Sequence, residues 1–468
     1  MPRWIATATG GQVNPANQLP DLPGALAGAD RNVVATVFRL LAATFRFDPA
    51  GQFNQKMFAW RNSTRRGYPG AKTRHGGSII QSGTHIGYDL VMNDAKISIL
   101  DLSPGDLQAQ TAEFGMPKYR AAQIMEWIYK KRAVTFDQMT NLSRNDRALL
   151  AEHYTLFTGE VTRHVRATDA TEKILIRWAD GGLTESVMIP SDDDRTDDDG
   201  NVTVAHRRTA CLSTQVGCPV GCAFCASGLQ GLKNNLRAGQ IIEQALRLTA
   251  LLPEKMRLSN VVFMGMGEPL ANFEATVAAI RILMADWGLK IGGRKITVST
   301  VGLPPQIRQL ADTGLPVTLA ISLHAPNDAL RKRIIPWARG ITIAAIVDAG
   351  QYYFQNTGRE LTLEYIMLDG VNTLPEHAGE LAAIAKKLRA NVNLIYYNEV
   401  PELPFRRPSG KTMLEFQTAL RSAGVNAHVR RSRGRDIAAA CGQLARQDRD
   451  KPVNVTVTPR AEPEITGT

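Results

Sequence analysis

Five cysteines occur in the chain, and four of them lie within fifteen residues. Three of these, Cys218, Cys222 and Cys225, have the spacing Cys-x3-Cys-x2-Cys in a loop that also contains glycine and proline. Thiolates are the usual ligands of iron–sulfur clusters, and three of them would bind three irons of a four-iron cluster. The fourth iron would then stay open to chelate a small molecule. Structural zinc is the alternative, but it favours four ligands, and this loop contains no histidine.

The other two cysteines, Cys211 and Cys441, stand outside this triad. A lone cysteine is usually a small buried apolar residue, and local spacing alone gives these two no other role. An odd total of five cysteines, in a chain without a secretory pattern, argues against a disulfide framework. It favours a metal site in a reducing compartment.

A second motif, Gly265-Met266-Gly267-Glu268-Pro269, directly follows a run of strand-forming residues. Barrel enzymes keep their sites at the carboxyl ends of strands, and a carboxylate there could hold an ammonium group. Ser299, Ser322, His324 and Asn398 also stand at or just beyond the ends of predicted strands. We expect these side chains to share one edge of a sheet.

Strand-like and helix-like runs alternate from Thr209 to about Arg430. Repeated strand–helix units predict a parallel sheet with right-handed crossovers, and six or so units predict an incomplete (β/α)6 barrel of the α/β class. The predicted helices include 238–251, 274–285 and 376–388. The predicted strands are 211–214, 260–264, 295–299, 317–322, 361–368 and 393–397.

A small helical domain is predicted before this barrel. Ser103-Pro104 is a good helix start, with serine as the N-cap and proline in the first turn. Further helices are predicted over 120–132 and 143–153, and extended segments over 173–190. The acidic stretch Asp192–Asp199 fails the spacing of a calcium loop, because Arg195 occupies the first ligand position, so we expect a solvated hairpin loop there.

The net charge of +11 is unevenly distributed. Residues 1–91 hold ten Lys/Arg against four Asp and no Glu, so much of the excess charge lies outside the predicted barrel. We expect this segment to be a disordered extension or a start called too early, with Met92 as the true beginning. A transit peptide and an extra domain are the alternatives. No stretch is long and apolar enough to span a membrane, so we expect a soluble, cytoplasmic protein.

The cysteine motif and the glycine motif together resemble the radical S-adenosylmethionine (SAM) superfamily, and longer stretches resemble the RlmN/Cfr family of RNA adenine methyltransferases. The similarity runs from about Ile99 to Gln447. We expect three parts within it: a helical RNA-docking domain over 92–156, a hairpin region over 157–204 and the barrel domain over 205–447. Residues 448–468 are predicted to be a disordered tail. The matching stretches are CLSTQVGCPVGCAFC (211–225), FMGMGEPL (263–270), SLHAPND (322–328) and DIAAACGQL (436–444).

The resemblance implies a role for each candidate residue. Cys218, Cys222 and Cys225 would bind one [4Fe–4S] cluster. Cys441 would carry a methyl group, Cys211 would resolve a protein–RNA crosslink by forming a disulfide with it, and Glu185 would accept a proton. The alternative for Glu185 is an exposed glutamate on a strand. The residues implied to contact SAM are Gly267, Glu268, Ser299, Ser322, Leu323, His324 and Asn398.

The implied reaction is methylation of adenine C2 in 23S rRNA, and of the adenosine 3′ of the anticodon in tRNA, with two SAM consumed per turnover. The resemblance also implies a monomer that takes electrons from a donor such as a flavodoxin. Methylation at C8, as in Cfr, is the first alternative, but Pro269 after Glu268 matches the RlmN pattern. A non-enzymatic, metal-bearing RNA-binding protein is the second. The arginines that could bind RNA phosphates are Arg406, Arg407, Arg430, Arg431, Arg433 and Arg435.

A chain that starts at Met92 should fold and methylate RNA like the full chain, because the preceding residues contain no recognisable core or motif. Limited proteolysis of the full chain should remove residues 1–91 first, since exposed, unpacked backbone is cut first. The comparison is of methylation rates and of far-ultraviolet circular dichroism for both chains. A truncated protein that folds but has lost methylation would contradict this expectation.

Overall fold

The computed structural model describes residues 96–191, 195–196, 202–204 and 207–444. The chain divides into two units, Met1–Asp89 and Leu90–Thr468, and every described residue lies in the second. The predictions for residues 1–91, for most of the acidic loop Asp192–Asp199 and for the tail 448–468 therefore concern residues outside those described.

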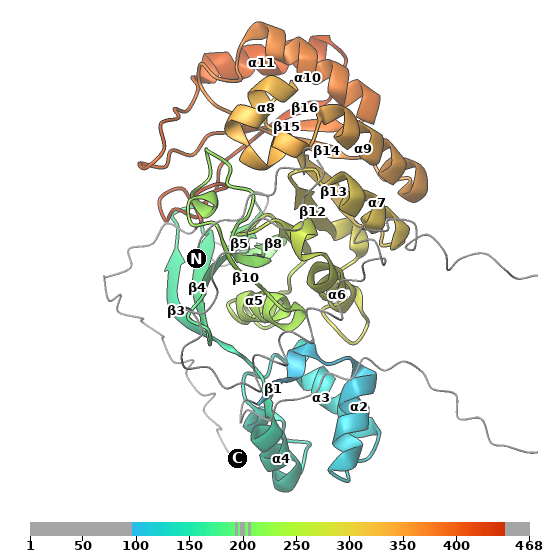
Figure 1. Ribbon diagram of the computed structural model, residues 1–468. Coiled ribbons are helices and arrows are strands. Elements are labelled where there is room, and N and C mark those ends of the chain that lie inside the picture. The colour runs from blue at the N-terminus through green and yellow to red at the C-terminus, as the bar shows by residue number, and fades with distance from the viewer. Residues whose placement is uncertain (1–95, 192–194, 197–201, 205–206, 445–468) are drawn as a thin grey trace, which may run out of the picture. The chain divides into compact units, whose positions relative to one another are not determined.

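One ten-stranded sheet organises the described residues, in the order β16-β15-β14-β13-β12-β11-β8-β5-β4-β3 (Figure 1). Its first seven members in this order are mutually parallel, so their carboxyl ends meet at one edge. Neither β16 nor β3 pairs with the other, so the sheet is an open, incomplete barrel, as predicted. The parallel strands are β8 (Arg208–Cys211), β11 (Asn260–Phe263), β12 (Ile296–Thr300), β13 (Thr318–Ser322), β14 (Thr362–Met367), β15 (Asn391–Tyr396) and β16 (Ala427–Arg430).

The six predicted strands all have a counterpart in this sheet. The first begins three residues earlier than predicted, at Arg208, and ends at Cys211. The seventh parallel strand, β16, was not predicted: it is only four residues long and mixes Ala427 and Val429 with His428 and Arg430. Its backbone hydrogen bonds to β15 hold it in the sheet.

Helices connect the parallel strands, and Figure 1 shows α6, α7, α9 and α10 along the outside of the curved sheet. Each buries an apolar stripe; in α5, for example, Ile241, Ile242, Ala245 and Leu248 are fully buried. These stripes and the strands form one continuous core. The helices are α5 (Ala238–Ala250), α6 (Phe273–Met284), α7 (Pro304–Asp312), α8 (Asp328–Ile334), α9 (Ile343–Thr357), α10 (Pro375–Leu388) and α11 (Gly410–Ser422).

Three antiparallel strands extend the sheet beyond β8: β5 (Leu183–Pro190), β4 (Glu172–Trp178) and β3 (Gly159–Arg166). They confirm the prediction of extended segments over 173–190. Within the acidic region, β6 (Arg195–Thr196) and β7 (Val202–Val204) form an antiparallel pair, as a hairpin requires.

The N-terminal helices are α2 (Pro104–Glu113), α3 (Tyr119–Tyr129) and α4 (Arg144–His153), accompanied by the short parallel pair β1 (Ile97–Ser98) and β2 (Tyr154–Thr155). Ser103 caps α2 as predicted, and it forms a capping box with Asp106. Ser143 caps α4 by accepting a hydrogen bond from the backbone N–H of Asp146.

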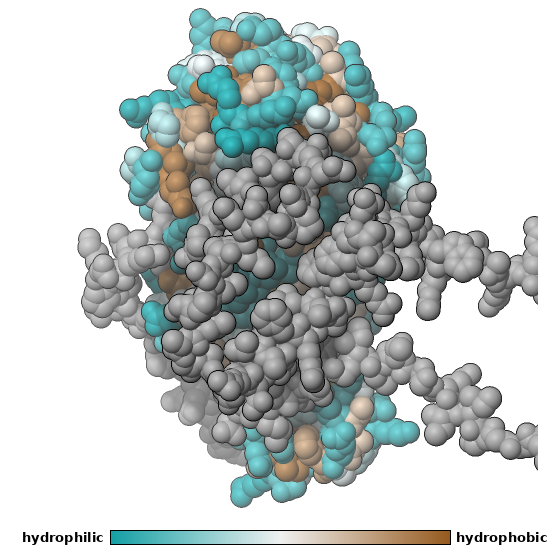
Figure 2. Space-filling model, viewed as in Figure 1, coloured by the Kyte–Doolittle hydropathy of each residue, from teal (hydrophilic) through white to brown (hydrophobic). Residues whose placement is uncertain are grey.

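Two carboxylates attach the segments before and after these helices to α5 of the barrel. Asp101 accepts hydrogen bonds from the backbone N–H of Gly239 (2.7 Å) and from Arg237. The fully buried Glu243 accepts from the backbone N–H groups of Thr158 and Gly159, just where β3 begins. The described helices include none long and apolar enough to cross a membrane. The surface that faces the viewer over α8, α10 and α11 is largely hydrophilic (Figure 2).

Candidate functional site

The three-cysteine loop runs from the short hairpin strand β9 (Gln215–Gly217) to its partner β10 (Leu232–Asn235). Gly217 has a φ of 77°, and a Cβ there would lie 1.9 Å from the carbonyl oxygen of Gly231, so only glycine fits this crossing. The backbone N–H of Cys218 donates to that same oxygen at 3.0 Å. The hairpin therefore fixes the point at which the loop leaves the sheet.

The thiols of Cys218, Cys222 and Cys225 are near enough to affect one another. Burial raises the pKa of all three thiols, and the charge of Cys225 further raises those of Cys218, to about 12, and Cys222. Three neighbouring thiolates repel one another unless a cation compensates their negative charge, and the iron ions of a cluster would supply that positive charge. The donor set thus fits a cluster.

No group of three or more His, Cys, Asp or Glu side chains in the described residues converges to hold a single metal ion. A four-iron cluster does not require such convergence, because each cysteine binds a different iron.

The glycine motif clamps the chain after β11 against the segment that leads to the cysteine loop. Gly267 has a φ of 102°, and a Cβ there would lie 2.7 Å from the Cβ of Gln215. The carbonyl oxygen of Met266 accepts hydrogen bonds from the backbone N–H groups of Thr214 (2.9 Å) and Gln215 (3.2 Å). Close backbone approach is the physical reason for glycine at these positions.

Glu268 is buried, and both of its carboxylate oxygens accept backbone hydrogen bonds. The donors are Leu270 N–H, at 3.0 Å, and Val301 N–H, at 2.8 Å. Burial raises the pKa of Glu268 to about 7, against the opposing effect of the hydrogen bonds from Val301, Thr300 and Leu270. The side chain therefore holds the end of β12 in place, and only its remaining lone pairs could face a ligand.

The ends of β12 and β13 bring the next predicted residues together. The hydroxyl oxygens of Ser299 and Ser322 lie 3.1 Å apart. Leu323 is fully buried, and its backbone N–H donates to the carbonyl oxygen of Glu364 at 3.1 Å. His324 has a left-handed φ of 59°, and its Nδ1 accepts a hydrogen bond from Ile366 N–H at 3.1 Å. Burial, assisted by the charge of Arg331, lowers the pKa of His324 to about 3, so its ring is neutral.

Asn398, just beyond β15, links this edge to the segment that contains Cys441. Its Nδ2 donates to the carbonyl oxygen of Cys441 at 3.2 Å. Its Oδ1 is buried and has no hydrogen-bond partner among the described residues. A buried carbonyl left without a donor costs about 1–3 kcal/mol, so this atom fits a polar ligand such as SAM.

Cys211 and Cys441 are both free thiols, and the structure brings them to the same place. Cys211 is buried at the end of β8 and packs in one apolar cluster with Ala439 and Leu444, which flank Cys441. Burial raises the pKa of Cys211 to about 12, and the charge of Cys441 contributes to this shift. Cys441 is exposed, although the surrounding protein still desolvates its thiol and raises its pKa.

The segment around Cys441 is also bound to the cysteine loop. Ala226 N–H donates to the carbonyl oxygen of Gly442 at 2.9 Å, and the Ser227 hydroxyl donates to that of Leu444 at 3.1 Å. Both donors directly follow Cys225 in the chain. The loop and the Cys441 segment are therefore neighbours at the carboxyl edge of the sheet.

Glu185 is 3% exposed, so the alternative of an exposed strand glutamate is wrong. Its Oε1 forms a buried ion pair with Lys173 Nζ at 2.8 Å. Lys173 in turn donates to the carbonyl oxygen of Ala438 at 3.1 Å, three residues before Cys441. The pair thereby connects the antiparallel strands to the Cys441 segment.

The arginines proposed to grip phosphates differ in their surroundings. Arg430 pairs with Glu364, and Arg433 lies 4.0 Å from Asp169. The guanidinium of Arg407 lies over the ring of Tyr396, 4.0 Å from its centre. The remaining three, Arg406, Arg431 and Arg435, are exposed.

Sequence reasoning missed two charged residues of this region, Glu364 in β14 and Arg331 in α8, which are 4% and 1% exposed. Arg331 donates to the carbonyl oxygens of Leu323 and Val301, and so joins the ends of β13 and β12. A signal existed for Glu364, because a single acidic residue in an apolar, parallel strand calls for an explanation.

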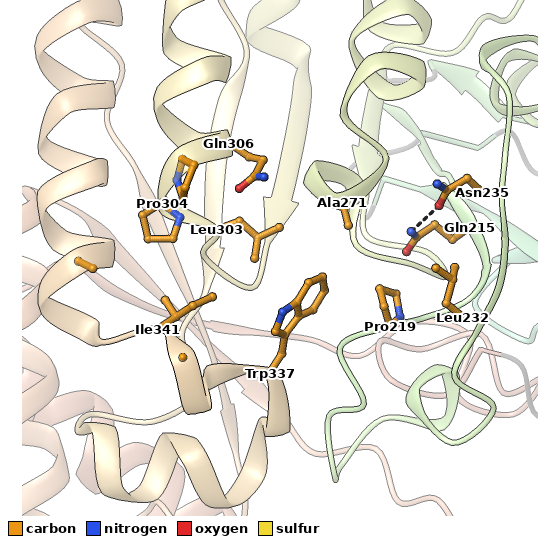
Figure 3. A pocket seen from close by; sticks show the side chains of 13 residues that line it. Gln215, Pro219, Leu232, Asn235, Ala271, Leu303, Pro304, Gln306, Trp337 and Ile341 are labelled. Atoms are coloured by element: carbon orange, nitrogen blue, oxygen red, sulfur yellow. Dashed lines mark hydrogen bonds between the residues drawn. The ribbon is translucent and has the colours of Figure 1, made fainter. Parts of the chain in front are cut away.

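A cavity of about 650 Å³ lies beside the cysteine loop, on the side of Pro219 (Figure 3). Trp337 stands between its two walls. Gln215, hydrogen-bonded to Asn235, lines one wall, and Leu303 lines the other. The cavity contains none of the residues predicted to bind SAM.

Comparison with known proteins gives the same assignment for both parts of the chain. Residues 212–382 match the radical SAM superfamily, and residues 97–156 match the ribosomal RNA large subunit methyltransferase N-terminal domain. A probable dual-specificity RNA methyltransferase RlmN from Rhodopirellula baltica is 45% identical over 351 residues, which are 75% of this chain and 91% of the relative. The dual-specificity RNA methyltransferase RlmN of Syntrophus aciditrophicus is 43% identical over 76% of this chain and 98% of its own length.

A solved structure is similar over the same range. The crystal structure of a radical SAM methyltransferase from Sphaerobacter thermophilus is 43% identical, with a TM-score of 0.70, and the match covers 75% of this chain and 99% of that one. Identity at this level over nearly whole relatives, together with the paired domain matches, shows the family. The chain belongs to the RlmN family of radical-SAM RNA methyltransferases.

Proposed function

We propose that this enzyme methylates C2 of an adenine in 23S rRNA, and of the adenosine 3′ of the anticodon in tRNA, through a methyl group carried by Cys441. The observation that carries the proposal is the position of two free thiols, Cys211 and Cys441, beside the three-cysteine loop. The carbon C2 lies between two ring nitrogens and is a poor nucleophile, so it cannot take a methyl directly from SAM. A protein thiol can.

The superfamily implies a [4Fe–4S] cluster and SAM, and Cys218, Cys222 and Cys225 would hold the cluster. When bound, the cluster supplies the electron that cleaves SAM reductively. The neighbouring residues Gly267, Ser299, Ser322 and Asn398 line the same edge and would orient SAM. Glu268, Leu323 and His324 would contribute through their backbone or their remaining lone pairs.

In the first step, the Cys441 thiolate attacks the methyl group of one SAM. A bond forms between sulfur and carbon, the methyl–sulfonium bond breaks, and S-adenosylhomocysteine leaves. The charge of Arg430 favours the thiolate by lowering the pKa of Cys441, against the larger effect of burial. A second SAM is consumed when a carbon radical is made from this methyl group, which accounts for two SAM per turnover.

After the radical adds to the base, the RNA is joined to Cys441 through the new carbon. The adduct then still carries one unpaired electron. Glu185 takes the proton from the base carbon, with Lys173 holding its carboxylate in place. The unpaired electron would return to the oxidised cluster, and this loss leaves a closed-shell protein–RNA adduct on Cys441. The Cys211 thiolate then attacks the Cys441 sulfur. A disulfide forms and the sulfur–carbon bond breaks; its electron pair stays with the carbon, which takes up a proton as the RNA leaves.

The exposed arginines Arg406, Arg431 and Arg435 are suited to bind RNA phosphates near this edge. A soluble one-electron donor such as a flavodoxin would supply the reduced cluster, and an external thiol would reduce the Cys211–Cys441 disulfide to the two free thiols. The enzyme would act as a cytoplasmic monomer. Methylation at C8 is the alternative reaction at the same adenine, and Pro269 in the glycine motif favours C2 over it.

If the enzyme methylates C2, RNA from a strain that lacks this gene should lack 2-methyladenosine at the target positions. Mass spectrometry of its 23S rRNA and tRNA should show adenosine where the parent strain has 2-methyladenosine, and complementation should restore the modification. A Cys441→Ala gene serves as the matched control and should fail to complement. Restoration of 8-methyladenosine would instead assign the enzyme to the alternative reaction.

The cysteine loop predicts the metal content. Enzyme purified without oxygen should carry about four irons and four sulfides per chain. Cys218→Ala should lose both the iron and SAM cleavage, whereas Cys211→Ala, outside the triad, should keep its iron. Stoichiometric zinc and no iron in active, anaerobically purified enzyme would show that the loop is not a cluster site.

The two remaining cysteines should give different products when each is removed. Cys441→Ala should form neither methylated protein nor methylated RNA, because the methyl carrier is gone. Cys211→Ala should still methylate Cys441 and add it to the RNA, but it should accumulate a covalent adduct that migrates slowly on a denaturing gel and disappears with nuclease. An adduct-free Cys211→Ala enzyme, and wild-type turnover with no Cys211–Cys441 disulfide, would rule out both roles.

A further inference from the structure

Glu364 is the one acidic residue in the apolar strand β14, and its side chain points into the barrel. The neighbouring Tyr365 stacks on Phe416 of α11, with ring centres 5.6 Å apart, so it faces the outer helices. Side chains alternate along a strand, so Glu364 faces the opposite way. In register, Glu364 lies between Ser322 on β13 and Asn393 on β15.

The backbone of Glu364 supports the loop that is expected to contact SAM. Its carbonyl oxygen accepts hydrogen bonds from Leu323 N–H, at 3.1 Å, and His324 N–H, at 3.4 Å. On the next strand, the hydroxyl of Ser299 meets that of Ser322. The carboxylate therefore belongs to the same layer as two serine hydroxyls at the carboxyl edge.

Within the described part of the chain, hydrogen bonds and ion pairs reach only one oxygen of the Glu364 carboxylate. Oε1 accepts a hydrogen bond from Asn393 Nδ2 at 2.9 Å and lies 3.5 Å from Arg430 Nη1. Oε2 is buried and has no hydrogen-bond partner among the described residues. Two donors on one oxygen fix the orientation of the group, so the free oxygen is held in a defined place.

A buried acceptor without a donor is destabilising, and more so when it is charged. Burial raises the pKa of Glu364, and the opposing effect of Arg430 and Asn393 favours the ionised form. Asn398 Oδ1, just beyond the adjacent strand β15, is a second buried acceptor to which no described residue donates. Two buried acceptors, Glu364 Oε2 and Asn398 Oδ1, could thus accept hydrogen bonds from a bound molecule.

We propose that Glu364 binds ribose: its Oε2 accepts a hydrogen bond from a hydroxyl of the adenosyl group of SAM, held against Ser299 and Ser322. A carboxylate that accepts from a ribose hydroxyl is a recurring device in nucleotide sites. The paired hydroxyls of ribose both donate and accept, which suits a carboxylate oxygen beside serine hydroxyls. The inference rests on the proposed use of SAM and adds a residue to its site.

The test measures binding to the cluster-loaded enzyme, without turnover. Equilibrium dialysis without oxygen compares SAM with 2′-deoxy-SAM and 3′-deoxy-SAM. Wild-type enzyme should bind at least one deoxy analogue about 10-fold or more weakly than SAM, as expected for loss of a hydrogen bond to a charged group. Glu364→Leu should bind that analogue and SAM alike, whereas the control Glu360→Leu, exposed just before β14, should discriminate as the wild type does.

Each analogue ratio is measured within one protein, so a partly folded variant does not distort it. Equal binding of all three ligands by the wild type, or discrimination retained by Glu364→Leu, overturns the inference. A third outcome also overturns the inference. Glu364→Leu would still discriminate SAM from its deoxy analogues, but it would no longer discriminate adenosine from purine riboside at the target position of an RNA oligonucleotide. That result would assign Glu364 to binding of the target base. Failure of the wild type to bind SAM at all would instead refute the proposed function.

Discussion

The parallel alignment of seven strands is the constraint on which the site depends. Parallel strands carry all their carboxyl ends to one edge, so the short segments after β8, β11, β12, β13 and β15 must meet there. The cysteine loop, the glycine motif and Asn398 lie in those segments, and the pair Ser299 and Ser322 lies at the ends of β12 and β13 themselves. These are the residues that could do chemistry. Glycines at crowded crossings, such as Gly217 and Gly267, let the segments approach at backbone distance.

Hydrogen bonds between different segments, more than contacts within any one helix or strand, keep the site residues in position. Glu268 connects the glycine motif to the end of β12, and Arg331 connects the ends of β12 and β13. Asn398 connects β15 to the Cys441 segment. Each link uses a buried polar group that would be costly to leave unpaired, so the segments keep fixed relative positions.

The barrel and most of its site could be predicted because their signals are local. Alternating apolar strands and amphipathic helices have clear periods, and the spacing of Cys218, Cys222 and Cys225 is itself a chemical pattern. Other features could not be predicted, because they depend on pairs from distant parts of the chain. The Glu185–Lys173 ion pair, the Glu364–Arg430 pair and the short strand β16 are all fixed by partners on neighbouring strands.

The hydrogen bonds from Ala226 and Ser227 to the Cys441 segment have a consequence for cooperativity. The two donors directly follow the last cysteine of the loop, so any opening of the loop also removes the hydrogen-bond donors of the Gly442 and Leu444 carbonyl oxygens. Loop and segment should therefore exchange their amide hydrogens as one unit, with a single opening free energy. In such a unit, order in the loop is transmitted directly to the position of the Cys441 thiol.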